Sequence, residues 1–187
     1  MNVAVYSGSF RPLHIGHMAV IEYLLEKAGY DMVYLIVSPS NPFKDSGLGV
    51  SAGERLAAAR EVVSRHPLCG RILVDDIEFG MPRPSYTINT LDALKAREPE
   101  NAFTLVVGGD CFHEITSWRE GGRILSEYGV AVYPREGSDI SADCASLLGA
   151  HPEYRIRLLE DAQKINVSST QIREMLAEGG DVTKLLP

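Results

Sequence analysis

The segment VAVYSGSFRPLHIGHMAVIEYLLEKA, Val3–Ala28, carries the pattern that decides the fold. Its first residues, Val3–Tyr6, form a short apolar run that predicts a buried strand. A turn containing two glycines follows, and apolar residues at helical spacing then predict a helix over His17–Ala28. A strand that leads through a glycine-bearing turn into a helix is typical of an α/β protein.

The same alternation continues to the end of the chain. Further strands are predicted at Val33–Val37, Ile72–Val74, Phe103–Val107, Val130–Tyr133 and, more weakly, Tyr154–Leu159. Further helices are predicted at Ala52–Ser64, Ile88–Arg97, Gly122–Glu127 and Ala142–Leu148, and one begins at Ser168. Apolar strands separated by helices predict a doubly wound, mainly parallel sheet with helices on both faces. With 187 residues, we expect one domain over 1–187.

Composition limits the classes of partner. The net charge of −7 disfavours binding along a nucleic-acid backbone, so we expect no nucleic-acid partner. No apolar run approaches membrane-spanning length and no secretory signal is evident, which predicts a cytoplasmic protein without a membrane partner. Three scattered cysteines indicate neither a disulfide framework nor a zinc knuckle. The sequence leaves open whether identical chains assemble into an oligomer.

The turn GSFRPLHIGH, Gly8–His17, is the first candidate site because ligands of open α/β sheets lie beyond the carboxyl ends of the strands. Gly8 and Gly16 permit close backbone approach, and the helix start offers amides to an anion. His14 and His17 lie about one helical turn apart and can face one ligand. Two alternatives are helix-capping histidines and a zinc pair, although no third ligand lies within sequence reach.

The turn has neither the lysine of a P-loop nor the spacing of a dinucleotide fingerprint. Its His-x-Gly-His signature resembles the nucleotidyltransferase superfamily, in which both histidines contact ATP phosphates. A second segment, VSSTQIR at Val167–Arg173, resembles the C-terminal Ile-Ser-Ser-Thr-x-Ile-Arg motif of that superfamily. Taken alone, that segment is a terminal helix with a capping box of Ser168 and Gln171. Together the two motifs predict a Rossmann-like nucleotidyltransferase fold.

Further segments resemble the nicotinate mononucleotide adenylyltransferase branch of this superfamily. PSNPFK, Pro39–Lys44, resembles a loop that ends in a phosphate-binding lysine, and Lys44 on a solvated loop is the alternative. SYTINTL, Ser85–Leu91, resembles the acceptor-binding segment, and VVGGDCFHEITSW, Val106–Trp118, resembles the segment that holds adenosine and the pyridine ring. Three positions depart from the family: Arg11 replaces an aspartate, Phe43 replaces a histidine, and the sequence ends at Pro187 without the usual Tyr-Ile.

The resemblance implies a set of site residues. Those expected to act on the reacting phosphates are His14, His17, Lys44 and Arg173. Those expected to bind ATP are Gly8, Ser9, Phe10, Gly16, Gly108, Asp110, Arg135, Ser168 and Ser169. Those expected to bind the acceptor are Tyr86, Thr87 and Trp118. For Trp118 a structural position in the core is the alternative. No dedicated metal site is expected, and Mg²⁺ would arrive with ATP.

The implied activity is transfer of AMP from ATP to the phosphate of nicotinate mononucleotide, giving nicotinic acid adenine dinucleotide and pyrophosphate. Its partners would be ATP and the mononucleotide. Two alternatives stay open. The acceptor could instead be nicotinamide mononucleotide or phosphopantetheine, because a few pocket donors decide that choice. The chain could also be a nucleotide-binding sensor that keeps the fold without catalysis.

Overall fold

A computed structural model describes residues 1–39, 50–134, 140–162 and 167–187. Its strands form one six-stranded sheet in the order β3-β2-β1-β4-β5-β6, and every pairing in it is parallel. The strands are β1 (Asn2–Gly8), β2 (Met32–Val37), β3 (Ile72–Asp75), β4 (Ala102–Gly108), β5 (Val130–Tyr133) and β6 (Ile156–Leu158). The predicted doubly wound fold is confirmed, with a sheet that is parallel throughout.

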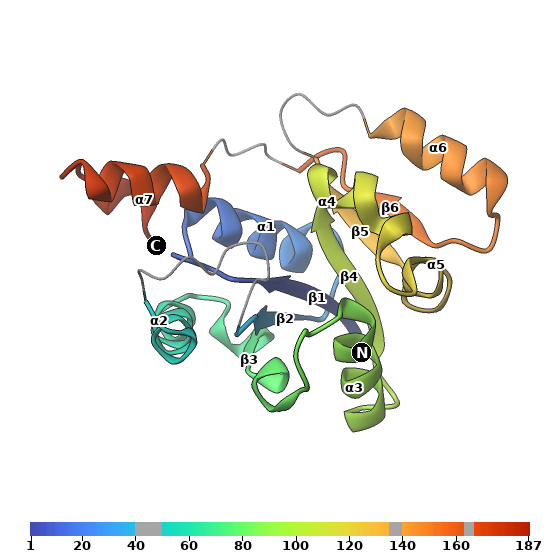
Figure 1. The fold of residues 1–187 in the computed structure, drawn as a ribbon, viewed down its shortest axis with the longest axis horizontal. Coiled ribbons are helices and arrows are strands. Elements are labelled where there is room, and N and C mark those ends of the chain that lie inside the picture. The colour runs from blue at the N-terminus through green and yellow to red at the C-terminus, as the bar shows by residue number, and fades with distance from the viewer. Residues whose placement is uncertain (40–49, 135–139, 163–166) are drawn as a thin grey trace.

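Helices cover both faces of this sheet (Figure 1). Their bounds are α1 (Ile15–Glu26), α2 (Ala52–Ser64), α3 (Thr87–Arg97), α4 (Gly109–Glu114), α5 (Gly121–Arg123), α6 (Ser141–Ala150) and α7 (Ser169–Ala177). Apolar residues of α1 and α2 pack in one core cluster with residues from one face of the strands. Those of α3, α4 and α6 pack in a second cluster with residues from the other face. The sheet therefore separates two cores.

The central strands are apolar on both faces, which is why the sequence shows runs rather than alternation. Val3, Ala4 and Val5 of β1 are almost fully buried, and they belong in turn to the two core clusters. β1 pairs with β2 as far as Gly8 opposite Val37, so both strands end at the same edge of the sheet. We call this the carboxyl edge.

The largest difference from the prediction lies at the expected helix Gly122–Glu127. The structure has the single turn α5 here, followed by a π-helical turn, η4 (Ile124–Tyr128). Gly121 is required at the start of α5, because a Cβ there would lie only 1.9 Å from the carbonyl oxygen of Ile115. Sequence periodicity cannot signal so short and wide a turn.

The helix starts predicted from serine residues are present. The Ser51 hydroxyl accepts the Glu54 amide at 3.2 Å, and the Glu54 carboxylate accepts the Ser51 amide at 2.7 Å, which completes a capping box. At α7 the Ser168 hydroxyl accepts the Gln171 amide at 3.1 Å. Short 3-10 turns that the sequence did not predict are η1 (Cys69–Arg71), η2 (Ile77–Gly80), η3 (Ile115–Ser117) and η5 (Thr183–Leu185).

Candidate functional site

The turn between β1 and α1 stands at the carboxyl edge and is shaped by Phe10. This residue has a φ of 42°, which non-glycine residues adopt rarely, and it is 4% exposed. The ring folds back over Gly8, where a Cβ would lie 3.1 Å from Phe10 Cζ. A larger residue at Gly8 would push the ring out of the turn. The predicted ATP-binding residues Gly8 and Phe10 therefore fix one another's conformation.

The two histidines of the signature stack on each other at the start of α1. Their ring centroids lie 3.6 Å apart with an interplanar angle of 29°, and His14 is the buried member of the pair. The edge of Phe10 meets the His17 ring at 5.0 Å between centroids. Gly16 is required between them, because a Cβ there would lie 3.0 Å from His14 Nδ1. The signature thus encodes a packed pair of rings.

The orientation of the His17 ring follows from one hydrogen bond. The His14 backbone N–H donates to His17 Nδ1 at 3.2 Å. An accepting Nδ1 carries no proton, so the neutral ring carries its proton on Nε2. His17 is half-buried. It can therefore present an N–H donor at Nε2 to a ligand oxygen.

Helix α7 brings the second motif to the same turn. Ser169 Oγ donates to the carbonyl oxygen of Pro12 at 3.1 Å, across 157 residues of sequence. Arg173 Nη1 donates to the carbonyl oxygen of Arg11 at 2.8 Å. Ile172 between them is fully buried. The start of α7 thus lies against the turn that begins α1, as Figure 1 shows.

The bond between Arg173 and Arg11 does not depend on the Arg11 side chain, at which the sequence departs from the family. The atom that accepts the hydrogen bond is the main-chain oxygen of Arg11. A residue of any side chain supplies this oxygen. The aspartate usual in the family is therefore not needed for this contact.

The turn after β4 forms another part of the carboxyl edge. Gly108 is the N-cap of α4, with Asp110 in the first turn of that helix and exposed. Strand β4 lies between β1 and β5, with Tyr6 opposite Val106 and Gly108 opposite Tyr133. Gly108 therefore ends the strand that neighbours β1, and Asp110 lies directly after it, at the same edge of the sheet as the first turn.

The predicted acceptor residues lie at the start of α3 and after η3. Tyr86 is the N-cap of α3 and Thr87 its first residue. Trp118 directly follows η3 and is half-buried. Tyr86 and Trp118 both pack against the same core cluster. The guanidinium of Arg119, which the sequence did not single out, stacks over the Tyr86 ring at 4.7 Å from its centre. The structure thus places these residues on one face of the sheet.

Two predicted site residues, Lys44 and Arg135, lie outside the described residues. Ser9 is half-buried in the first turn, and its carbonyl oxygen accepts a hydrogen bond from Arg55. Within the described ranges there is no group of three or more histidine, cysteine or acidic side chains that could hold a metal ion. No helix in those ranges is long and apolar enough to span a membrane.

Arg55 of α2 holds two segments of the carboxyl edge together, although no motif in the sequence marked it. It is 8% exposed. Besides Ser9, its guanidinium donates to the carbonyl oxygens of Ser38 at 2.9 Å and Pro39 at 3.2 Å. One buried cation thus joins the turn after β1 to the segment after β2. The sequence could have indicated this role, because Arg55 lies on the buried face of α2, next to Leu56 and one turn before Ala59.

Glu78 has a similar role on the acceptor side. Its buried carboxylate accepts the Ser38 hydroxyl at 2.7 Å and the Thr90 hydroxyl at 2.9 Å. It therefore joins the segment after β2 to α3, the helix that begins at Thr87. No sequence pattern marked Glu78, because its partners come from different elements.

Arg55→Met is expected to lower the free energy of unfolding by about 3 kcal/mol, because three carbonyl oxygens lose a charged donor. Urea unfolding measures this change. Arg55→Lys should recover part of it, since an ammonium can satisfy fewer of the three oxygens. Arg60→Met is the matched control on the same helix, because Arg60 is exposed and pairs with exposed Asp76. Equal stability of the Arg55→Met and Arg60→Met variants would contradict this role.

Known proteins resemble the chain over nearly its whole length. The model of the cytidylyltransferase-like family matches residues 5–175. A Bacteroides fragilis protein named "Probable nicotinate-nucleotide adenylyltransferase" is 41% identical over 97% of this chain and 85% of its own length. A protein of the same name from Azobacteroides pseudotrichonymphae is 35% identical over 100% of this chain and 93% of its own.

A solved structure shares the fold. Plasmodium falciparum nicotinic acid mononucleotide adenylyltransferase complexed with NaAD superposes with a TM-score of 0.78 at 20% identity, covering 99% of this chain and 90% of that one. The region matched by the family model includes both helix starts that meet at the carboxyl edge, and it ends within α7. The chain therefore belongs to the cytidylyltransferase-like family and, within it, to the nicotinate-nucleotide adenylyltransferases.

Proposed function

We propose that the chain transfers AMP from ATP to the phosphate of nicotinate mononucleotide, giving nicotinic acid adenine dinucleotide and pyrophosphate. The relatives that cover the whole chain carry the name of this activity. One structural observation supports it above the others. The start of α7, with Ser169 and Arg173, lies on the turn that carries His14 and His17. Two helix starts at one place offer a triphosphate several main-chain amides together with cationic and neutral donors.

The proposed reaction needs no base and no covalent enzyme intermediate. A phosphate oxygen of the mononucleotide attacks the α-phosphorus of ATP, and the bond from that phosphorus to the bridging β-oxygen breaks. Pyrophosphate leaves with the electron pair. The protein must hold two anions in line and stabilise the charge that grows on the leaving group.

The donors at the carboxyl edge fit these tasks. We assign the Nε2–H of His17, with His14 stacked beside it, to the α- and β-phosphates. Arg173 and the start of α7 at Ser168 and Ser169 are assigned to the β- and γ-phosphates. These donors are held by bonds to the protein before ATP binds, and such preorganised donors contribute most to catalysis.

Other residues complete the proposed ATP site. Gly8 and Gly16 allow the phosphates close to the main chain, beside Ser9 and Phe10. Gly108 and Asp110 are assigned to the adenosine. Lys44 and Arg135 keep the roles that the family resemblance implies, as a phosphate-binding cation and an ATP-binding residue respectively.

Magnesium is proposed to arrive on the phosphates of ATP. The turn that carries His14 and His17 has no acidic residue between Gly8 and His17, and Asp110 lies in the first turn of α4, after the neighbouring strand. Such a set of residues fits an ion that keeps its waters and binds mainly phosphate oxygens. The ion would neutralise charge on the leaving pyrophosphate.

The acceptor is proposed to lie over Tyr86, Thr87 and Trp118. The start of α3 at Thr87 can receive an anionic group, and the exposed part of Trp118 can stack on a pyridine ring. A pocket that binds the carboxylate of nicotinate rejects an amide in its place, because its donors are then left without a charged partner.

We also propose a single domain over residues 1–187 and a cytoplasmic location.

Specificity constants for two acceptors test this proposal. We expect kcat/KM for nicotinate mononucleotide to exceed that for nicotinamide mononucleotide by roughly 10² or more, the scale set by an unpaired buried polar group. Phosphopantetheine should give no product. Equal or reversed constants would overturn the acceptor. Binding of ATP with no turnover of any acceptor would favour the sensor.

A further inference from the structure

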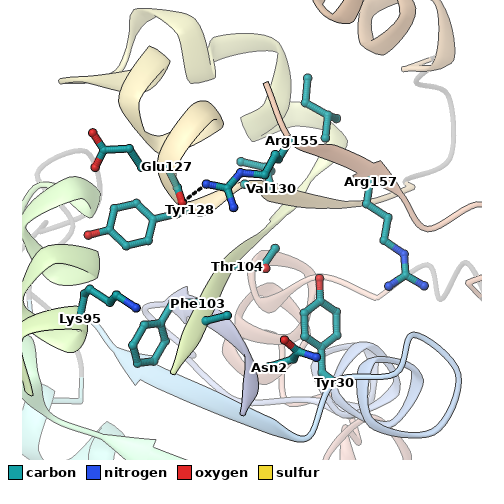
Figure 2. Close-up of a pocket in the computed structure, with 13 residues that line it drawn as sticks. Asn2, Tyr30, Lys95, Phe103, Thr104, Glu127, Tyr128, Val130, Arg155 and Arg157 are labelled. Carbon is teal, nitrogen blue, oxygen red and sulfur yellow. Dashed lines mark hydrogen bonds between the residues drawn. The ribbon is translucent and has the colours of Figure 1, made fainter. Parts of the chain in front are cut away.

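A cavity of about 480 Å³ opens at the amino ends of the strands, at the opposite edge of the sheet from the candidate site. Its lining includes the first residues of four strands, Asn2 of β1, Ala102 of β4, Val130 of β5 and Ile156 of β6. Figure 2 shows this amino-edge cavity with its labelled side chains. Its volume lies in the range of small-molecule pockets. None of the predicted site residues lines it.

Three cationic side chains line the amino-edge cavity. Figure 2 shows the nitrogen ends of Lys95, Arg155 and Arg157 arranged around Phe103 and Thr104 of β4. They come from α3, from the segment before β6 and from β6 itself. Three cations gathered from separate elements concentrate positive charge in a protein whose net charge is −7.

Hydrogen bonds to main-chain oxygens hold these cations in place. Lys95 Nζ donates to the oxygens of Pro99 at 2.7 Å and Asn101 at 2.8 Å. Arg155 Nε donates to Ser126 at 2.8 Å, and Arg157 Nη1 donates to Ala28 at 2.6 Å. An ammonium has three donors and a guanidinium has five, so each head keeps donors for a ligand. The cations are thus positioned before any ligand binds.

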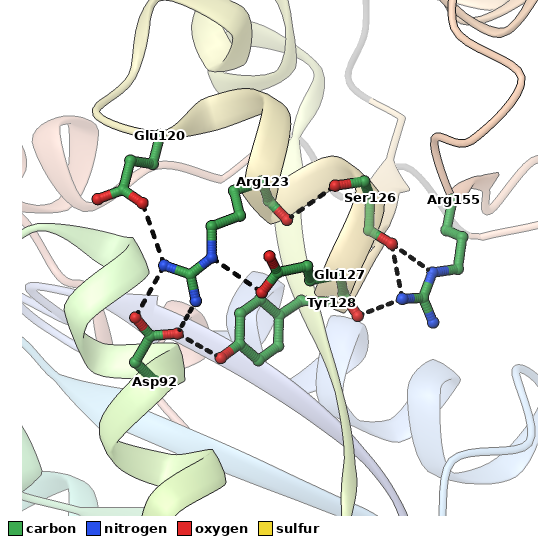
Figure 3. A network of polar contacts seen from close by, with 7 residues as sticks. All are labelled: Asp92, Glu120, Arg123, Ser126, Glu127, Tyr128 and Arg155. Atoms are coloured by element: carbon green, nitrogen blue, oxygen red, sulfur yellow. Dashed lines mark hydrogen bonds and ion pairs between the residues drawn. The ribbon is translucent and has the colours of Figure 1, made fainter.

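The acidic side chain that lines the described part of the cavity is paired with a cation outside the lining. Among the described residues that line the cavity only Glu127 is acidic, and its carboxylate accepts Arg123 Nε at 2.8 Å. Arg123 also bonds to Asp92 at 3.0 Å and to Glu120 at 3.1 Å. Figure 3 shows these three carboxylates gathered around one guanidinium. The Arg123 hydrogen bond lowers the pKa of Asp92, so this carboxyl stays charged and paired there.

Hydroxyl groups supply the remaining polar lining. Tyr30 is 7% exposed, and its hydroxyl lies in hydrogen-bond contact with Thr104 and Arg157. Burial raises the pKa of the Tyr30 hydroxyl further above its ordinary value, at which a tyrosine is already protonated at neutral pH. Thr104 is half-buried on β4. One buried and one half-buried hydroxyl beside three exposed cations form a surface that suits an oxyanion.

We propose that the amino-edge cavity is a second ligand site, which binds a small molecule bearing phosphate or carboxylate groups. Three preorganised cations attract an anion, because Glu127, the acidic residue of the described lining, is paired with Arg123 outside the cavity. The hydroxyls of Tyr30 and Thr104 complete the donor set. Single exposed ion pairs are weak, so binding depends on all three cations acting together. Binding should weaken as salt is added.

Two-dimensional ¹⁵N NMR of the full chain tests this site with two probes, inorganic pyrophosphate and citrate. We expect saturable amide shifts at Ala102, Thr104, Val130 and Arg157 with at least one probe. The probe with the lower Kd identifies the ligand group as phosphate or carboxylate. Pyrophosphate can also shift Gly16 and Gly108 at the carboxyl edge, and these signals are resolved from the first set.

Matched variants separate the site from general charge attraction. The Arg155→Gln/Arg157→Gln double variant should raise Kd at the amino edge at least tenfold and leave the shifts of Gly16 and Gly108 unchanged. The Arg60→Gln/Arg65→Gln double variant is the control, because it removes the same charge from exposed positions on α2 and beside its end. If the first double variant does not fold, Thr104→Val keeps every arginine bond and should still weaken binding several-fold.

The proposal is overturned by three results. These are amide shifts confined to the carboxyl edge, shifts that do not saturate with either probe, and equal Kd values for the two double variants. Where Thr104→Val replaces a double variant that does not fold, a Kd equal to that of the unchanged chain overturns the proposal as well.

Discussion

His17→Ala is expected to lower kcat by roughly 10² or more, the usual loss when one preorganised transition-state donor is removed. In the structure the His14 amide fixes His17 Nδ1 as an acceptor, which leaves Nε2 as the donor. Alanine removes that donor together with the bond from the His14 amide. Steady-state kinetics with ATP and nicotinate mononucleotide measure the loss, and circular dichroism and thermal unfolding check the fold.

The control for His17 is His151→Ala, because His151 is an exposed histidine at the end of α6. This variant should keep the full rate. His17→Gln should recover part of the lost rate, since an amide nitrogen can donate to a phosphate oxygen. A His17→Ala variant that turns over at nearly the rate of the unchanged chain would remove His17 from the proposed machinery.

Arg173→Ala is expected to lower kcat/KM for ATP by roughly 10² or more, because the proposed site loses a charged donor to the β- and γ-phosphates. It also loses the bond from Arg173 to the carbonyl oxygen of Arg11. Arg173→Lys should recover part of the loss, since a lysine keeps the charge but not the fork of donors. Kinetics at several ATP concentrations separate the effects on KM and kcat.

Two further variants isolate the role of Arg173 in binding ATP. Thr170→Val removes only the bond from Arg173 Nη2 to the Thr170 hydroxyl at 3.0 Å, and it should have a small effect. Arg65→Ala removes an exposed arginine paired with Glu61, and it should have none. If Arg65→Ala and Arg173→Ala had equal effects on kcat/KM, the second helix start would not bind the triphosphate.

The strands and most of the longer helices could be predicted because their residues carry strong local patterns. The runs at β1, β2 and β4 are apolar on both faces, and the serine of the α2 capping box marks the first turn of that helix. The helix expected at Gly122–Glu127 is instead the short turns α5 and η4, and the six-residue helix α4 was missed, because each is too short for a periodic pattern. Gly121 is a further position that no periodic pattern marks, because the need for glycine there comes from the nearby carbonyl oxygen of Ile115.

The site was predictable only where a motif marks it. The turn Gly8–His17 and the segment Val167–Arg173 were found by resemblance, and the structure brings them together through Pro12 and Arg11. Arg55 and Glu78 carry no motif, because their partners lie on other elements. The amino-edge cavity likewise depends on side chains from several elements, which only the packed sheet brings together.

Release of pyrophosphate from ATP upon addition of nicotinate mononucleotide is the most direct test of the central claim that these two helix starts hold ATP for AMP transfer. We expect pyrophosphate and nicotinic acid adenine dinucleotide to form in equal amounts, to require both substrates, and to form far more slowly in the His17→Ala and Arg173→Ala variants. Binding of ATP without any pyrophosphate from the unchanged chain would contradict it.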